Sequence, residues 1–198
     1  CCPAWVSWCE KNRPELSKYI STCRSPQQMF GSVLREHFKR DNKRVVSVSV
    51  MPCTAKKSEI YRFGDDKTRD VDYVLTATEL IDLFLEKGID LASVAPSKAD
   101  DPFGFGSGGG VIFGVTGGVT EAVLRQLSPD SDEAGYREIA ELGQRGEGGV
   151  KEFNLDYKGR RLRIAVVSGL GNAARVMDAI EAGEHYDLVE IMSCPGGC

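Results

Sequence analysis

The chain has 198 residues, of which 41% are hydrophobic and 27% charged, a composition typical of a globular protein that buries its own core. Its formal net charge of −4 gives no support for nucleic-acid binding, and it has no run of about 18 apolar residues that could cross a membrane. The seven cysteines are odd in number, and none lies between Cys53 and Cys194. Metal or cluster binding in a reducing environment therefore explains them better than a disulfide scaffold.

The first predicted elements are two helices. One covers residues 14–20, begins with a proline in its first turn and has Asn12 as its N-cap. The other begins with Ser25 as the N-cap, Pro26 at the first helical position and Gln28 completing a capping box. Apolar residues then follow at helical spacing, which predicts a face that packs against the rest of the chain.

A strand is predicted over residues 45–50, which are mostly apolar and β-branched. Pro52 cannot donate to a sheet ladder and should end the strand, so Cys53 is delivered on a loop at the carboxyl end. Ligands bind at such ends in open α/β sheets. Lys56 and Glu59 follow within reach of the same place, which makes this loop the first candidate for a site.

The middle of the chain predicts another strand and helix. Residues 71–75 form the strand, and Thr76 and Glu79 offer a capping box that starts an amphipathic helix. This order favours a parallel sheet. A polar loop and a glycine-rich stretch follow over residues 97–110, near which we expect the boundary between two lobes. The glycines lack the Gly-Lys-Ser or Gly-Lys-Thr ending of a phosphate-binding loop.

The last part of the chain predicts a β-hairpin and a second strand–helix–strand unit. Asp156 to Gly159 joins the hairpin strands, and the second strand leads through a glycine turn into a helix and a final strand. The fold class is α/β, with two lobes of mainly parallel twisted sheet flanked by helices and a cluster site in the cleft between them. The predicted helices cover 119–127, part of 128–149 and 172–181, and the strands cover 151–155, 162–167 and 186–192.

Four cysteines could act together as thiolate ligands, either around a tetrahedral zinc ion or around an iron–sulfur cluster. Structural zinc sites usually combine two closely spaced pairs, whereas this set has one such pair and two single residues, so a cluster is favoured and zinc stays an alternative. Cys9 and Cys23 sit among helical residues and are expected to be buried and inert. The candidate ligands are Cys2, Cys53, Cys194 and Cys198.

Three motifs resemble the signature motifs of iron-only (FeFe) hydrogenases. They are C-C-P-A-W from Cys1, M-P-C-T-A-K-K-S-E from Met51 and E-I-M-S-C-P-G-G-C from Glu190. Between them, S-P-Q-Q-M-F-G from Ser25 and V-I-F-G-V-T-G-G-V-T-E from Val111 are also similar to the family. The resemblance covers essentially the whole chain, which it identifies as a partial catalytic domain over residues 1–198, truncated at both ends.

The resemblance implies an H-cluster, in which a 4Fe-4S cluster is joined through a cysteine sulfur to a diiron centre that carries CO, cyanide and a bridging dithiolate. By motif position, Cys2, Cys53, Cys194 and Cys198 would hold the 4Fe-4S cluster, with Cys198 as the bridging thiolate. Lys56 would donate a charge-assisted hydrogen bond to a cyanide. The residues implied to line the diiron pocket are Pro26, Gln27, Met51, Phe113 and Met192, although the two methionines alone would be interpreted as core residues.

The resemblance also implies how protons and electrons are supplied. Cys1 would be a free thiol that relays protons, with Ser21 as a hydroxyl of that relay and Glu59 as an acidic residue beside the site. The implied reaction is the reversible reduction of protons to hydrogen, with electrons from ferredoxin or a similar carrier, after maturation proteins have delivered the diiron centre. An iron–sulfur assembly factor or a sensory homologue of the same fold is the alternative.

The beginning and end of the sequence bear on location and activity. No signal peptide is visible, which favours the cytoplasm, but the periplasm stays open because the sequence begins abruptly at Cys1. Neither nucleic acid nor a membrane is expected as a partner. Because both ends are cut at a motif, we expect the isolated 198-residue chain to be inactive as a hydrogenase.

Overall fold

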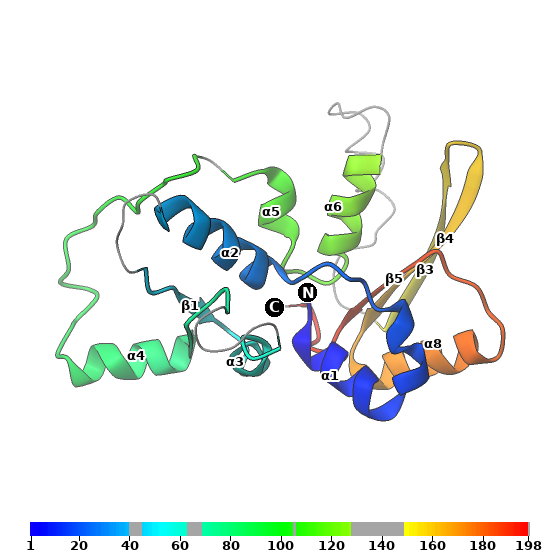
Figure 1. Cartoon of the computed structure of the whole chain (residues 1–198), viewed down its shortest axis with the longest axis horizontal. Coiled ribbons are helices and arrows are strands. Elements are labelled where there is room, and N and C mark those ends of the chain that lie inside the picture. Colours follow the sequence, from blue (N-terminus) through cyan, green and yellow to red (C-terminus); the bar gives the residue numbers. More distant parts are fainter. Residues whose placement is uncertain (40–44, 63–68, 105, 128–148, 198) are drawn as a thin grey trace. The chain divides into compact units, whose positions relative to one another are not determined.

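The computed structural model describes residues 1–39, 45–62, 69–104, 106–127 and 149–197, and the chain divides into two compact units (Figure 1). Unit 1 consists of Cys1, Pro3–Ser7 and Ser17–Asp100, and unit 2 of Cys2, Trp8–Leu16 and Asp101–Cys198. Helix α1 (Pro3–Asn12) and the 3-10 helix η1 (Pro14–Tyr19) contribute residues to both. Within the described residues, no helix is both long and apolar enough to cross a membrane.

Unit 1 is built on a parallel pair of strands, β1 and β2, in which Met51 lies opposite Thr76. Met51 packs against a small cluster of buried apolar side chains, Ile60, Val71 and Val74. The chain passes from β1 through the short helix α3 to β2 and then directly into α4, which gives the strand–helix order expected from the sequence. The elements of unit 1 are α2 (Pro26–Phe38), β1 (Val48–Met51), α3 (Ala55–Glu59), β2 (Tyr73–Thr76) and α4 (Ala77–Glu86).

Side-chain caps fix where the helices of unit 1 begin. At α4 the capping box is complete, because Glu79 accepts the Thr76 backbone N–H at 2.8 Å and Thr76 accepts the Glu79 N–H at 3.2 Å. At α2, Ser25 accepts the Gln28 backbone N–H at 3.4 Å, as predicted. The reciprocal bond predicted from Gln28 is wrong: its buried amide atoms have no hydrogen-bond partner in the described part of the chain.

Unit 2 is built on a sheet with the strand order β3-β4-β5, antiparallel between β3 and β4 and parallel between β4 and β5. Lys158 and Gly159 form the two-residue turn of the hairpin with φ values of 49° and 75°, the left-handed conformation that matches the strand twist. The predicted hairpin is therefore confirmed. The elements of unit 2 are α5 (Gly108–Ile112), α6 (Gly118–Leu127), β3 (Val150–Tyr157), β4 (Arg160–Ser168), α8 (Leu170–Glu181) and β5 (Leu188–Met192).

The core of unit 2 is organised around β4, whose side chains from Ile164 to Val167 are at most 1% exposed. Helix α8 connects β4 to β5 and packs against both strands, and Leu124 of α6 packs with Ile164. At the carboxyl ends of the two parallel strands, the Gly169 N–H donates to the Met192 carbonyl at 2.7 Å. The α/β class predicted from the sequence is confirmed, and β5 runs directly into the C-terminal cysteine motif.

Some local predictions differ from the structure. Residues 14–20 form the 3-10 helix Pro14–Tyr19 rather than an α-helix, and Asn12 is the last residue of α1, where its side chain donates to the Trp8 carbonyl at 2.8 Å. Cys9 is 1% exposed, as expected, but Cys23 is exposed because it lies in the non-helical segment before α2. The elements predicted within 128–148 lie outside the described residues.

Candidate active site

A buried ion pair lies on helix α3, directly after the loop that carries Cys53. Lys56 and Glu59 are three positions apart, so their side chains share one face of the helix. The Lys56 Nζ lies 3.0 Å from the Glu59 Oε2, and the two side chains are only 4% and 7% exposed. Lysine is seldom buried to this extent unless its charge is paired, so the carboxylate accounts for the burial of the ammonium.

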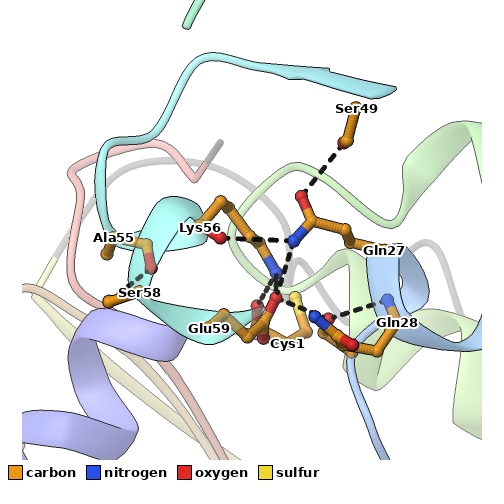
Figure 2. A network of polar contacts seen from close by, with 9 residues as sticks. Cys1, Gln27, Gln28, Ser49, Ala55, Lys56, Ser58 and Glu59 are labelled. Carbon is orange, nitrogen blue, oxygen red and sulfur yellow. Dashed lines mark hydrogen bonds and ion pairs between the residues drawn. The ribbon is translucent and has the colours of Figure 1, made fainter. Parts of the chain in front are cut away.

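Three donors converge on a single oxygen of Glu59 (Figure 2). Besides the Lys56 ammonium, the Ser25 hydroxyl donates to Oε2 at 2.9 Å and the Gln27 amide donates to it at 3.2 Å. The Gln27 amide nitrogen also donates to the Lys56 carbonyl at 3.4 Å, and the Ser49 hydroxyl donates to the Gln27 Oε1 at 3.0 Å. We call these five residues, which lie at the start of α2, in β1 and in α3, the Lys56 network.

The Lys56 network extends to the first residue of the chain. Lys56 Nζ donates to the Cys1 backbone carbonyl at 3.0 Å, in addition to its bond with Glu59 (Figure 2). An ammonium group has three N–H donors, and these two bonds use two of them. The side chain is therefore held by two acceptors, and its third donor meets no acceptor among the described residues.

The other candidate residues of unit 1 are less deeply placed. Cys53 is half-buried between β1 and α3, and its carbonyl accepts the Lys56 backbone N–H at 3.3 Å. Pro26 is exposed at the start of α2. Ser21 is also exposed, and its hydroxyl accepts the Cys23 backbone N–H at 3.2 Å in a local turn.

Unit 2 brings the N-terminal and C-terminal motifs together. Cys2 is 6% exposed, and its Sγ donates to the Ser193 hydroxyl at 3.2 Å across 191 positions of the chain. Ser193 directly precedes Cys194, which is exposed. Met192, at the end of β5, is 1% exposed, and Phe113 at the end of α5 is half-buried. The expected ligand Cys198 lies outside the described residues.

Two sets of close contacts hold the C-terminal motif to the loop between α5 and α6 and to the first turn of α6. Glu190 is 7% exposed, and its two carboxylate oxygens accept the backbone N–H groups of Gly117 and Thr120, each at 2.7 Å. At the other end of the motif, Gly197 has a φ of 103° and a Cβ added there would lie 2.2 Å from the Gly114 carbonyl oxygen. Only glycine fits such an approach, so the two contacts fix the path of the motif.

Sequence reasoning missed four residues that these contacts involve. Ser49 and Glu190 lie in strands, where a polar side chain is usually interpreted as solvent-facing, and the partners of both are distant in the chain. Ser193 had a signal in its position between a strand and a cysteine, and Ser25 was expected only as a helix cap. The missed residues are Ser25, Ser49, Glu190 and Ser193.

Residues 1–198 match the family described as the C-terminal domain of the iron-only hydrogenase large subunit. The chain belongs to this family. Iron hydrogenase 1 of Clostridium pasteurianum is 38% identical over 205 residues, and the periplasmic Fe hydrogenase large subunit of Nitratidesulfovibrio vulgaris is 39% identical over 212 residues. In both comparisons this hydrogenase domain is covered completely, but it spans only 36% and 49% of the relatives' own lengths.

Other relatives extend the range of functions. The cytosolic iron–sulfur assembly component 3 of Mus musculus is 32% identical over 217 residues, covering 100% of this hydrogenase domain and 44% of that protein. Among solved structures, a variant of the FeFe hydrogenase HydA1 from Chlamydomonas reinhardtii is 35% identical, with a TM-score of 0.70. That comparison covers 100% of this hydrogenase domain and 59% of the solved chain. The fold is therefore that of the FeFe hydrogenases.

The residues present fit the cofactor that this family implies. None of the six described cysteines forms a disulfide, so no described candidate ligand is lost to one. Unit 1 contains Cys53 and the buried Lys56 ammonium, and unit 2 contains Cys2 and Cys194. Among the described residues, no group of three or more His, Cys, Asp or Glu side chains could hold a metal ion. The fit is one of residue type, because cysteine thiolates are the ligands that iron–sulfur clusters take.

Proposed function

We propose that this chain is the part of a hydrogenase that holds an H-cluster, at which protons are reversibly reduced to hydrogen. The observation that carries the proposal is the Lys56 network: a buried ammonium three residues after Cys53, held by Glu59 and the Cys1 carbonyl, whose third donor meets no acceptor among the described residues. Such a group suits a small anionic ligand in a dry site, because charge-assisted hydrogen bonds are strong where water is excluded. Cyanide on a diiron centre is the anion that the family supplies.

Four thiolates would hold the 4Fe-4S cluster: Cys2, Cys53, Cys194 and Cys198. Cys198 would bridge to the diiron centre, which, when bound, supplies the redox and hydrogen chemistry. The remaining pocket residues would hold that centre by packing and weak polar contacts. They are Pro26, Gln27, Met51, Phe113 and Met192.

The Cys1 thiol would deliver protons to the diiron centre, with Ser21 continuing the path toward solvent. The exposure of both residues supports this, because a proton path must reach water. The Cys1 carbonyl is held by Lys56, which limits the positions that the thiol can take. Glu59 would act through Lys56, by keeping its ammonium in place, rather than by transferring protons itself.

Electrons would come from ferredoxin or a similar carrier, and hydrogenase maturation proteins would deliver the diiron centre. Neither a nucleic acid nor a membrane is part of this proposal. We infer a cytoplasmic location, although a relative in Nitratidesulfovibrio vulgaris is periplasmic by name.

Reconstitution and spectroscopy test the proposal. The protein is reconstituted anaerobically with iron and sulfide, treated with hydrogenase maturation proteins, and examined by metal analysis and infrared spectroscopy. We expect about four irons and four sulfides from the cluster before maturation, and CO and cyanide bands after it. Cys53→Ser should lose the cluster, whereas the matched control Cys23→Ser, which changes an exposed free cysteine, should keep it.

The second candidate is an iron–sulfur assembly or sensory homologue, which the similarity to the assembly component of Mus musculus supports. An assembly factor would bind iron and sulfide but show no CO or cyanide bands after maturation. A sensory homologue would show the bands, and would turn over little hydrogen even when this chain is placed within a complete, active hydrogenase. Zinc without iron or sulfide in the reconstituted protein would instead indicate a structural metal site and contradict both candidates.

A further inference from the structure

The orientation of the Gln27 side-chain amide is fixed by the groups around it. Its nitrogen faces the Glu59 carboxylate at 3.2 Å and the Lys56 carbonyl at 3.4 Å, both of which only accept hydrogen bonds. A flipped amide would point its oxygen at two acceptors. The Gln27 oxygen must therefore face the other way, where the Ser49 hydroxyl donates to it at 3.0 Å (Figure 2).

The Ser49 hydroxyl thus supplies the hydrogen bond that the Gln27 amide oxygen accepts. Gln27 is 8% exposed, so without that hydroxyl its buried oxygen would have no donor among the described residues. Ser49 lies in β1, where it pairs with Val74 in the parallel ladder, so the strand fixes its position independently of α2 and α3. The sheet therefore supports an amide that in turn contacts both members of the ion pair.

We propose that Ser49 is a positioning residue for the Lys56 ammonium, acting through Gln27. The Gln27 amide donates to the Lys56 carbonyl and to the Glu59 oxygen that accepts from Nζ. A displaced amide would therefore loosen both constraints on the lysine. The relevance of this to catalysis rests on the proposed function. The hydrogen bonds that connect Ser49, Gln27 and the ion pair are present in the protein without any metal.

Threonine and valine variants of Ser49 separate the effect of the hydroxyl group from the effect of side-chain shape. Ser49→Thr and Ser49→Val introduce side chains of the same shape that both suit a strand, but only threonine can donate to Gln27. Ser47→Val is a second control, because Ser47 is two positions earlier in the chain and its hydroxyl is bonded to Asp70 and Asp72 instead.

The first measurement is hydrogen exchange of the Gln27 side-chain amide and the Lys56 ammonium, followed by NMR in the metal-free protein. In Ser49→Val we expect both groups to exchange about tenfold faster or more, because one buried hydrogen bond is lost. Ser49→Thr and Ser47→Val should keep the wild-type rates. Unchanged Lys56 exchange in Ser49→Val, or equal acceleration in Ser49→Thr, would overturn the proposal.

The second measurement is the infrared spectrum of the matured protein. Ser49→Val should shift or broaden the cyanide bands, and Ser49→Thr should restore them. Cyanide bands that are identical in all variants would show that Lys56 stays in place and would also overturn the positioning role. If the wild-type protein shows no such bands, the proposed function fails, but the exchange measurement still decides the role of Ser49.

Discussion

The Glu190 carboxylate accepts the Thr120 backbone N–H at 2.7 Å, so the last strand of unit 2 holds the first turn of α6. Glu190→Gln should weaken this contact and its companion to Gly117, because an amide has one acceptor oxygen and its NH₂ group would face a donor. We expect the free energy of unfolding to fall by about 1–3 kcal/mol. Urea denaturation measures it, and the Gly117 and Thr120 amides should exchange faster.

A matched control for this change is Glu86→Gln. Glu86 is exposed at the end of α4, so the free energy of unfolding should change by less than about 0.5 kcal/mol. Equal effects of the two substitutions would contradict the role assigned to Glu190, because they would indicate a general effect of net charge.

The buried ion pair predicts a strong coupling between Lys56 and Glu59. Glu59→Gln leaves a buried ammonium without its counter-charge and should lower the free energy of unfolding by about 3–5 kcal/mol. Lys56→Met should also destabilise, but the double variant should lose less than the sum of the two, with a coupling of about 1–3 kcal/mol. A double-mutant cycle by urea denaturation measures it.

An exposed ion pair between α3 and α4 provides the control. Lys57 and Glu79 lie 2.6 Å apart but are 39% and 45% exposed, so water screens their attraction. The same cycle with Lys57→Met and Glu79→Gln should give a much smaller coupling. If the exposed pair showed a coupling free energy as large as that of the buried pair, burial would not determine the strength of the ion pair.

Two glycines at helix starts predict opposite effects of alanine. A Cβ on Gly118 would lie 1.7 Å from the Ile112 carbonyl oxygen, so Gly118→Ala should force α5 and α6 apart and destabilise unit 2. Gly171, the second residue of α8, has no atom within 4 Å of an added Cβ. Gly171→Ala should therefore stabilise, by up to about 1 kcal/mol, since alanine favours the helix. Thermal unfolding of both variants would show opposite shifts.

The capping box of α4 predicts that the stability of this helix depends on pH in the acidic range. The Lys57 side chain, followed by the Thr76 backbone N–H, lowers the pKa of Glu79 from 4.5 to about 2. Because this pKa is lowered in the folded state, the ionised carboxylate stabilises α4 above pH 4.5 and the stabilisation is lost as the pH falls toward 2. NMR titration of the Glu79 carboxyl group measures the shift, and a midpoint near 4.5 would contradict it.

Features decided by neighbouring residues could be predicted from the sequence. The Thr76 capping box and the turn at Lys158 and Gly159 depend on chemistry within a few positions, and both form as expected. Cys9 was expected among helical residues, but the bounds of α1 were not predicted, because its apolar and polar residues do not separate clearly onto two faces. Helix α3 was missed because five residues are too few to show a helical period.

The polar contacts of the site could not be predicted in the same way. The hydroxyl of Ser49 finds its partner 22 positions away, and the Glu190 carboxylate finds one of its partners 70 positions away. Tertiary packing decides such pairs, and no local pattern indicates them. The motif around Cys53 did point to Lys56 and Glu59, because both follow within a few positions of Cys53 at the predicted carboxyl end of a strand.

The Lys56 network comes almost entirely from residues 25–59, a short continuous stretch of unit 1. Closing so short a loop has a small entropic cost, and the contacts need nothing from unit 2. During synthesis, this stretch leaves the ribosome long before the C-terminal cysteines do. We therefore expect the nascent chain to form the surroundings of Lys56 early, so that the proposed cluster would be inserted beside an ammonium group that is already held in place.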